Sequence, residues 1–170
     1  MSEKEQILEI LQKAYQIEVD GYTFYAMTAE KAEKPAVKEL FEKLAMDEVQ
    51  HQAYLRAIGK GYAEKGASAF AVQTKPVDFL SAFSQKVFTE RFREQAKGAA
   101  FELGVLSVGM TLETNAVNCF AGAAREAREL EVKKFYEHLA EWERQHFEAL
   151  KALYDGVRMD FWHEGGFAAF

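Results

Sequence analysis

The sequence is poor in the residues that would interrupt a helix or link distant segments covalently. Two prolines and eleven glycines are spread over 170 residues, so few positions oppose long helices. Cys119 is the only cysteine, which excludes an intramolecular disulfide and a Cys-x-x-Cys metal site. With 49% hydrophobic residues, the chain is long enough to bury the core of one folded domain.

Three further absences limit the partners and the location that we expect. No apolar run approaches the roughly 18 residues that a membrane-spanning helix requires, so we expect no membrane segment. No basic run is present and the net charge is −6, which argues against nucleic acid as a main partner. Residues 1–6 are charged or polar after the first methionine and lead into an amphipathic pattern. We therefore expect no signal peptide and a cytoplasmic protein.

Apolar residues recur at spacings of three and four along most of the chain, which predicts an all-α protein. We expect an antiparallel four-helix bundle over residues 1–156, made of two repeated helix pairs, and an aromatic C-terminal tail at 157–170. The repeated halves cover about 5–63 and 100–155, and a long crossover with an extra helical segment covers about 66–95. The predicted helices are about 3–34, 35–63, 77–95, 96–128 and 130–155, with Gly156 ending the last.

A Glu-x-x-His sequence occurs twice, at equivalent places in the two halves. An offset of 95 residues aligns 13–55 with 108–150 without a gap, and 13 of the 43 positions are identical. Roughly three identities are expected from ordinary composition. Each half offers the same three polar side chains at the same spacing: Glu18, Glu48 and His51 in the first half, and Glu113, Glu143 and His146 in the second.

The surroundings of these side chains indicate that they face the core. Residues three apart on a helix lie on one face, so the Glu and His of each motif can reach the same ion. The stripe that carries Glu48 also carries Phe41, Leu44, Leu55 and Ile58, which are apolar. A carboxylate on such a stripe is buried, and burial of an isolated charge is costly.

Cations would resolve the conflict that four buried carboxylates create. At an effective dielectric of about 20, such carboxylates would repel one another by several kcal/mol. The sequence supplies no inward Lys or Arg at this level. Four carboxylates carry −4 and two divalent cations carry +4, so a dimetal site balances the charge. Oxygen-rich ligation with one imidazole per metal suits iron or manganese best, and zinc is a further possibility.

The structural alternative is weaker here than it would be for one motif. A single Glu-x-x-His pair more often lies on a solvated helix surface, and a lone inward Glu is more often a polar core residue with a satisfied hydrogen bond. Two such motifs in a repeat, each following an inward Glu by 30 residues, favour the dimetal interpretation.

At these residues the chain resembles the rubrerythrin branch of the ferritin-like diiron-carboxylate proteins. The segments 38–55 (KELFEKLAMDEVQHQAYL) and 133–150 (KKFYEHLAEWERQHFEAL) are similar to that family's second and fourth bundle helices. The likeness extends over about 5–155. It implies a ferritin-like bundle with terminal ligands Glu18 and Glu113, bridging ligands Glu48 and Glu143, and nitrogen ligands His51 and His146.

Two departures from the family pattern affect the expected chemistry. Full rubrerythrins carry a rubredoxin-like module with four cysteines, whereas this chain has one cysteine. We therefore expect electrons from a separate donor, such as a rubredoxin-like protein. Rubrerythrins also place an extra Glu one turn after the third-helix ligand, where this chain has Ala116. The ligand set is thus closer to the symmetric six-ligand arrangement of bacterioferritin.

The resemblance implies a non-haem diiron oxidoreductase that reduces hydrogen peroxide or dioxygen. The alternatives are a ferroxidase or iron-handling protein, in which iron is the substrate, and a non-catalytic metal-binding bundle. By analogy with other bundles of this kind, we expect a homodimer.

Several residues near the motifs are further candidates. Tyr25 lies two turns after Glu18, where its hydroxyl could donate a hydrogen bond to Glu113 or Glu143 or carry a proton or an electron near the site. The alternative is a core tyrosine whose hydroxyl finds another partner. Tyr22 is expected in the core. Asp47 and Gln50 flank the first motif and are candidates to orient the ligands.

Overall fold

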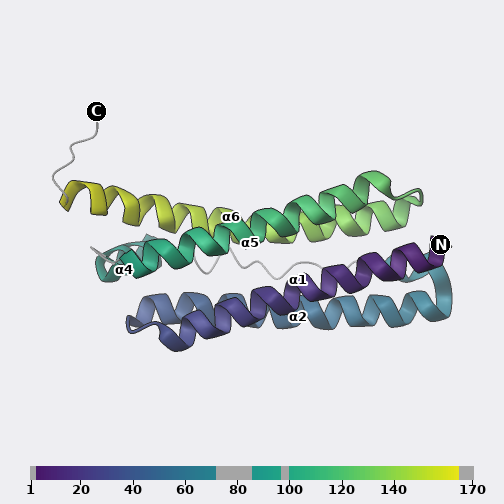
Figure 1. Cartoon of the computed structure of the whole chain (residues 1–170), viewed down its shortest axis with the longest axis horizontal. Helices are drawn as coiled ribbons and strands as arrows, with labels where there is room; N and C mark the ends of the chain where they lie inside the picture. The colour runs from purple at the N-terminus through teal and green to yellow at the C-terminus, as the bar shows by residue number, and fades with distance from the viewer. Residues whose placement is uncertain (1–2, 72–85, 97–99, 165–170) are drawn as a thin grey trace.

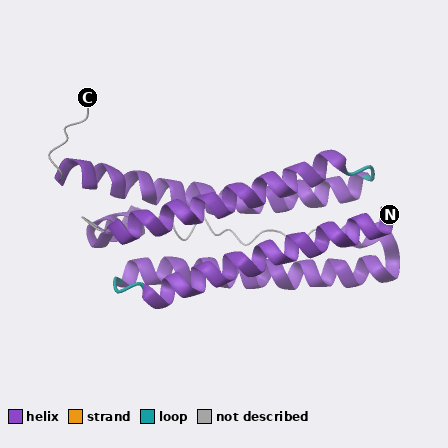
Figure 2. Cartoon of the chain, viewed as in Figure 1, coloured by secondary structure: helices purple, strands orange, loops and turns teal. Residues whose placement is uncertain are grey.

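The computed structural model describes residues 3–71, 86–96 and 100–164, and the described chain is helical apart from short turns (Figure 2). No strand occurs among these residues. The elements in order are α1 (Glu3–Lys31), α2 (Pro35–Lys65), a short 3-10 helix η1 (Gly66–Ala71), α4 (Lys86–Ala96), α5 (Ala100–Glu126) and α6 (Leu130–Glu164). The predicted all-α, ferritin-like bundle is confirmed.

The four long helices form two antiparallel hairpins that lie side by side (Figure 1). In one hairpin α1 packs against α2, and in the other α5 packs against α6. The hairpin turns repeat with the offset of the sequence: α1 ends at Lys31 and α5 at Glu126, 95 residues later. A backbone hydrogen bond that closes α1, from Ala32 N–H to the Thr28 carbonyl, recurs 95 residues on at the end of α5.

Two apolar clusters fill the bundle, one on each side of the six polar side chains. The first cluster includes Leu11 of α1 and Leu55 of α2, and the second includes Tyr25 of α1 and Leu44 of α2. Between them on every long helix lies a level with buried polar groups. This arrangement gives the polar level a rigid frame, because close-packed side chains above and below it hold the four helices in register.

The prediction that Gly156 ends the last helix is wrong, because α6 continues to Glu164. Residues 157–164, expected in the aromatic tail, are therefore helical. A Cβ added to Gly156 would lie 2.9 Å from Arg93 Cδ, so the glycine allows α4 to approach α6 closely. Arg93 then pairs with Asp160 one turn further on, and Val157 is buried at the same contact. Packing against α4 thus supports the end of α6.

Other predicted boundaries shift by a few residues. α2 continues through Gly59 and Gly61 to Lys65. Gly66 follows as its C-cap, and its φ of 65° suits a residue without a Cβ. Tyr22 is 41% exposed, so its predicted place in the core is wrong. The crossover prediction is met in part by η1 and α4, and positions 72–85 and 165–170 lie outside the described residues.

Membrane insertion through a helix finds no support in the described part of the chain. None of its helices combines the length and the apolar composition that crossing a bilayer requires.

Candidate metal centre

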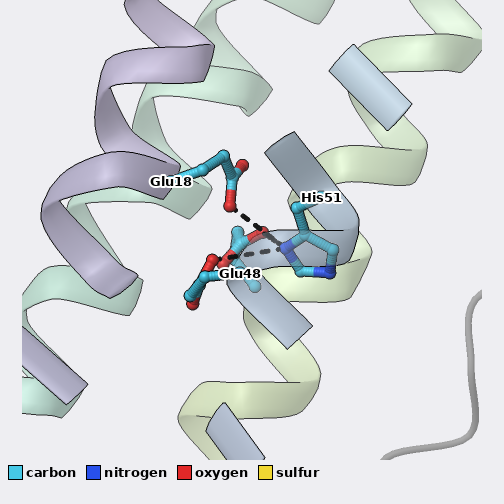
Figure 3. A group of neighbouring side chains, drawn as sticks. Glu18, Glu48 and His51 are labelled. Carbon is cyan, nitrogen blue, oxygen red and sulfur yellow. Dashed lines mark hydrogen bonds and ion pairs between the residues drawn. The ribbon is translucent and has the colours of Figure 1, made fainter. Parts of the chain in front are cut away.

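The four long helices direct six polar side chains to one level inside the bundle. Figure 3 shows Glu18 of α1 pointing toward Glu48 and His51 of α2. The hairpin of α5 and α6 supplies the equivalent side chains. All six predicted ligands are buried, with exposed fractions between 1% and 7%: Glu18, Glu48, His51, Glu113, Glu143 and His146. The apolar stripe of each helix therefore carries its polar residues into the interior, as the sequence predicts.

Two overlapping groups of these side chains have the spacing of metal ligands. Within each group the ligand atoms all lie within 4.8 Å of one another. Both groups contain Glu48 and Glu143, the arrangement expected of carboxylates shared between two ions. The first group adds Glu18 and His51, and the second adds Glu113 and His146.

Each histidine turns Nδ1 toward the carboxylates. His51 Nδ1 lies 3.1 Å from Glu18 Oε2, 3.3 Å from Glu143 Oε1 and 3.4 Å from Glu48 Oε2. His146 Nδ1 lies 3.5 Å from oxygens of Glu48 and Glu113 and 3.6 Å from Glu143 Oε2. The Nδ1 atoms are thus the nitrogens available to a cation held among the carboxylates.

The four buried carboxyl groups fall into two kinds by their pKa. Burial raises the pKa of Glu18 well above its ordinary value, and the neighbouring Glu143 and Glu48 raise it further. Burial also raises the pKa of Glu113, to about 8. Burial and Glu143 act to raise the pKa of Glu48 as well, but hydrogen bonds from His146 and His51 outweigh them and hold it at about 2. The pKa of Glu143 is lowered too, because both histidines outweigh its burial.

The histidines complete the charge balance of the metal-free cluster. Burial acts to lower the pKa of His51, but Glu143, Glu18 and Glu48 together outweigh it, and the net pKa lies well above the ordinary value. Burial of His146 is likewise outweighed, chiefly by Glu113. The raised pKa values of both histidines, Glu18 and Glu113 all favour bound protons, which occupy atoms that cations would otherwise bind.

The cluster fits a pair of metal ions in a second respect. Oxygen Oε1 of Glu18 is buried without a hydrogen-bond partner among the described residues. A buried carboxylate oxygen normally has a partner, so an unpartnered one within a cluster of this kind is consistent with metal ligation. Four carboxylates and two imidazoles suit iron or manganese.

Tyr25 adds a hydroxyl to one side of the cluster. The side chain is fully buried, and its hydroxyl donates a hydrogen bond to Glu113 Oε1, one of the two partners predicted from the sequence. Burial, followed by the charge of Glu113, raises the pKa of Tyr25 well above its ordinary value. The hydroxyl therefore keeps its proton beside the carboxyl group. Its repeat mate is Phe120, so this contact exists in one half only.

A cavity of 190 Å³ adjoins the carboxylates between α1 and α5. It is lined by Glu48, Glu113, Glu143 and Tyr25 together with three pairs of repeat mates: Ile17 and Leu112, Asp20 and Asn115, Gly21 and Ala116. A Cβ added to Gly21 would lie 3.2 Å from Glu48 Cδ. Small residues at both repeat positions thus leave space for a molecule of a few atoms next to the cluster.

The two histidines have different neighbours, because the repeat mate of Asp47 is Trp142. Asp47 Oδ2 lies 3.5 Å from His146 Nε2, and Gln50 Nε2 lies 3.5 Å from Asp47 Oδ1, which agrees with an orienting role for both. Sequence reasoning missed Trp142, whose ring stacks on His51 with centroids 4.6 Å apart. The available signal was its position, because residue 142 is the repeat mate of residue 47.

Sequence comparison places these observations within a known family. The family model described as Rubrerythrin matches residues 9–154, a segment that contains all six clustered side chains. No curated protein and no solved structure matches the chain. On the extent of the family match, the chain belongs to the rubrerythrin family.

Proposed function

We propose that this protein is a non-haem dimetal-carboxylate oxidoreductase, with two iron ions, that reduces hydrogen peroxide or dioxygen. The observation that carries the proposal is the convergence of four buried carboxylates and two imidazoles in two overlapping ligand groups. Terminal ligands would be Glu18 and Glu113, and bridging ligands would be Glu48 and Glu143. Two iron ions held by these groups would exchange electrons with an O–O bond and polarise it.

The cavity determines how a substrate approaches. Three of the carboxylates line it, whereas His51 and Trp142, whose rings stack on each other, do not. A volume of 190 Å³ between Gly21 and Ala116 accommodates hydrogen peroxide or dioxygen and limits entry of bulky molecules. Apolar residues around the cluster also restrict water, which strengthens electrostatic interactions inside it.

Tyr25 holds a proton where the reaction consumes one. Reduction of hydrogen peroxide to two waters requires two electrons and two protons. The Tyr25 hydroxyl lines the cavity and donates to Glu113, so it presents a proton donor beside the entering molecule. We propose that Tyr25 acts as a proton donor or relay and that a separate protein, such as a rubredoxin-like donor, supplies the electrons.

Rapid mixing of anaerobic, Fe(II)-loaded protein with peroxide or dioxygen tests the proposal. We expect oxidation of two irons per chain, faster with peroxide than with dioxygen, and repeated turnover when a reductant is supplied. Glu48→Gln keeps the side-chain shape but removes a bridging charge, and it should abolish the reaction. Glu141→Gln changes an exposed carboxylate on α6 and is the matched control. Failure of Fe(II)-loaded protein to react with either oxidant would contradict the proposal.

Iron handling is the second candidate, favoured by the carboxylate of Asp20 at the cavity and by the absence of a carboxylate at Ala116. In that case iron is the substrate, and the same experiment would show oxidation of many irons per chain without a reductant. A non-catalytic bundle would instead retain a redox-inactive metal and show no absorbance change on addition of peroxide.

A further inference from the structure

We propose that the two metal positions are unequal, and that the position formed by Glu113 and His146 binds the first cation and holds it more tightly. The Glu18 and His51 position is then filled second. This inference rests on the proposed dimetal site, in which both positions share Glu48 and Glu143. It concerns the order in which the two positions fill. The duplicated ligand set alone would give both positions the same affinity.

The first observation is the carboxylate behind His146. Asp47 immediately precedes Glu48 on α2, and its Oδ2 lies 3.5 Å from His146 Nε2, while His146 Nδ1 faces the cluster. The Asp47 side chain is only 13% exposed, and Gln50 Nε2 contacts its other oxygen at 3.5 Å. Asp47 can thus accept the Nε2 proton and fix the tautomer in which Nδ1 is free to bind a cation.

The second observation is that the equivalent residue behind His51 has no carboxylate. An offset of 95 carries Asp47 onto Trp142, whose ring stacks on His51 at 4.6 Å with an interplanar angle of 15°. The Trp142 indole N–H is buried without a hydrogen-bond partner in the described residues. Every ion pair of His51 in this part of the chain is made by Nδ1. Among the described residues, His51 therefore has a stacked aromatic ring but no acceptor that would fix its Nε2 proton.

Tyr25 reinforces the same asymmetry. Its hydroxyl donates to Glu113, whereas the repeat mate Phe120 offers Glu18 no hydrogen bond. The Glu113 and His146 position thus has two orienting contacts from outside the ligand set. A carboxylate bound to a ligating histidine raises ligand basicity and fixes the ring, and its loss typically lowers metal affinity about 10–100-fold.

Placement of the first ion is the decisive measurement, because two neighbouring cations repel each other and would bind in two steps even at equal positions. Crystals of metal-free protein given one equivalent of Mn²⁺ should show the stronger anomalous peak at Glu113 and His146. Asp47→Asn should lower the first binding constant about 10–100-fold and even out the two peaks. Glu141→Gln, which removes one exposed charge, should leave the first binding constant unchanged.

A converse variant distinguishes a specific effect of the orienting carboxylate from a general loss of stability. Trp142→Asp installs the missing carboxylate and should raise the occupancy at Glu18 and His51, whereas Trp142→Asn, equal in size, should not. Equal peaks in the unmodified protein, a first ion at Glu18 and His51, or an unchanged affinity in Asp47→Asn would overturn the inference. Ordered Mn²⁺ binding without any peroxide or dioxygen reaction would instead contradict the proposed oxidoreductase and leave this inference intact.

Discussion

Tyr25 and Phe120 occupy equivalent positions in the two halves, yet only Tyr25 brings a hydroxyl to the cluster. Gly21 and Ala116 form a second such pair, and Asp47 and Trp142 form a third. At the scale of single residues, then, the duplication fixes the ligands while its mismatches shape the surroundings. Substitutions at these mismatched positions separate binding, access and proton supply.

Tyr25→Phe is expected to cost stability as well as activity. Loss of the hydroxyl leaves Glu113 Oε1 without this buried donor, a change that costs about 1–3 kcal/mol of unfolding free energy. Urea unfolding of metal-free protein measures it. Tyr136→Phe is the matched control, because the buried Tyr136 hydroxyl has no hydrogen-bond partner in the described residues and its removal should not lower stability. Equal losses in both variants would refute the importance of the Glu113 contact.

Gly21→Ala should separate fold stability from metal binding. Alanine favours a helix over glycine by about 1 kcal/mol, so the metal-free fold should not be weakened greatly. The added Cβ, however, would lie 3.2 Å from Glu48 Cδ and displace that carboxylate, so Mn²⁺ affinity should fall. Calorimetric titration measures it. Gly104→Ala, at a helix position with open space around it, should leave Mn²⁺ affinity unchanged. Unaltered affinity in Gly21→Ala would contradict the assigned contact.

The sequence was sufficient to find the six clustered residues because a metal site requires particular side chains at fixed helical spacing. Trp142 could not be found in this way, since an aromatic residue on an apolar stripe is usually part of the core. The exposure of Tyr22 was missed for a related reason: a stripe of spacing three and four covers a broad arc of the helix. Gly21, rather than Tyr22, turns toward the cluster.

At the scale of elements, tertiary contacts account for the predictions that failed. The two hairpins followed from apolar periodicity, and Pro35 begins α2 as predicted. The end of α6 did not follow from periodicity. A glycine such as Gly156 often ends a helix, but packing against another element can carry the helix past it. Here Arg93 of α4, distant in sequence, lies against Gly156 and pairs with Asp160. Periodicity within one segment carries no information about such a contact.

Arg93→Ala should loosen the last turns of α6. Arg93 Nη2 and Nε lie 2.9 and 3.2 Å from the two Asp160 oxygens, and both distances are lost in the variant. Because the Arg93–Asp160 pair is partly exposed, its loss should lower the free energy of unfolding by about 1 kcal/mol at most. Hydrogen exchange should accelerate at 157–164 and remain unchanged at the metal site. Arg144→Ala, which breaks an exposed pair within α6, is the control. Unchanged exchange at 157–164 would show that this end of α6 is stable without α4.

At the scale of the whole molecule, the cluster links folding, protons and metal. The metal-free fold holds protons on Glu113, His51 and His146 at pKa values above their ordinary ones. Metal ions compete with these protons for the same atoms. Two apolar clusters flank this level, so close packing on both sides holds the helices whether protons or metal ions balance the carboxylates.

The stability of the metal-free protein should therefore fall as the pH rises from about 6 to about 8. Glu113, with a pKa of about 8 against an ordinary 4.5, contributes stability that is complete below 4.5 and lost as the pH passes about 8. The histidines act in the same direction, since their contribution is complete below 6.5. Thermal unfolding with a chelator measures this fall. The difference in Tm between the Mn²⁺-loaded and the metal-free protein should widen as the pH rises. A metal-free Tm that rises over this range would contradict the proton assignment.

The most direct test of the dimetal site is anomalous diffraction from crystals of protein loaded anaerobically with excess iron. Two iron peaks are expected roughly 3.5–4 Å apart, both within bonding distance of Glu48 and Glu143. One peak should also adjoin Glu18 and His51, and the other Glu113 and His146. A single peak, or iron bound elsewhere while these six side chains remain paired only with one another, would contradict it.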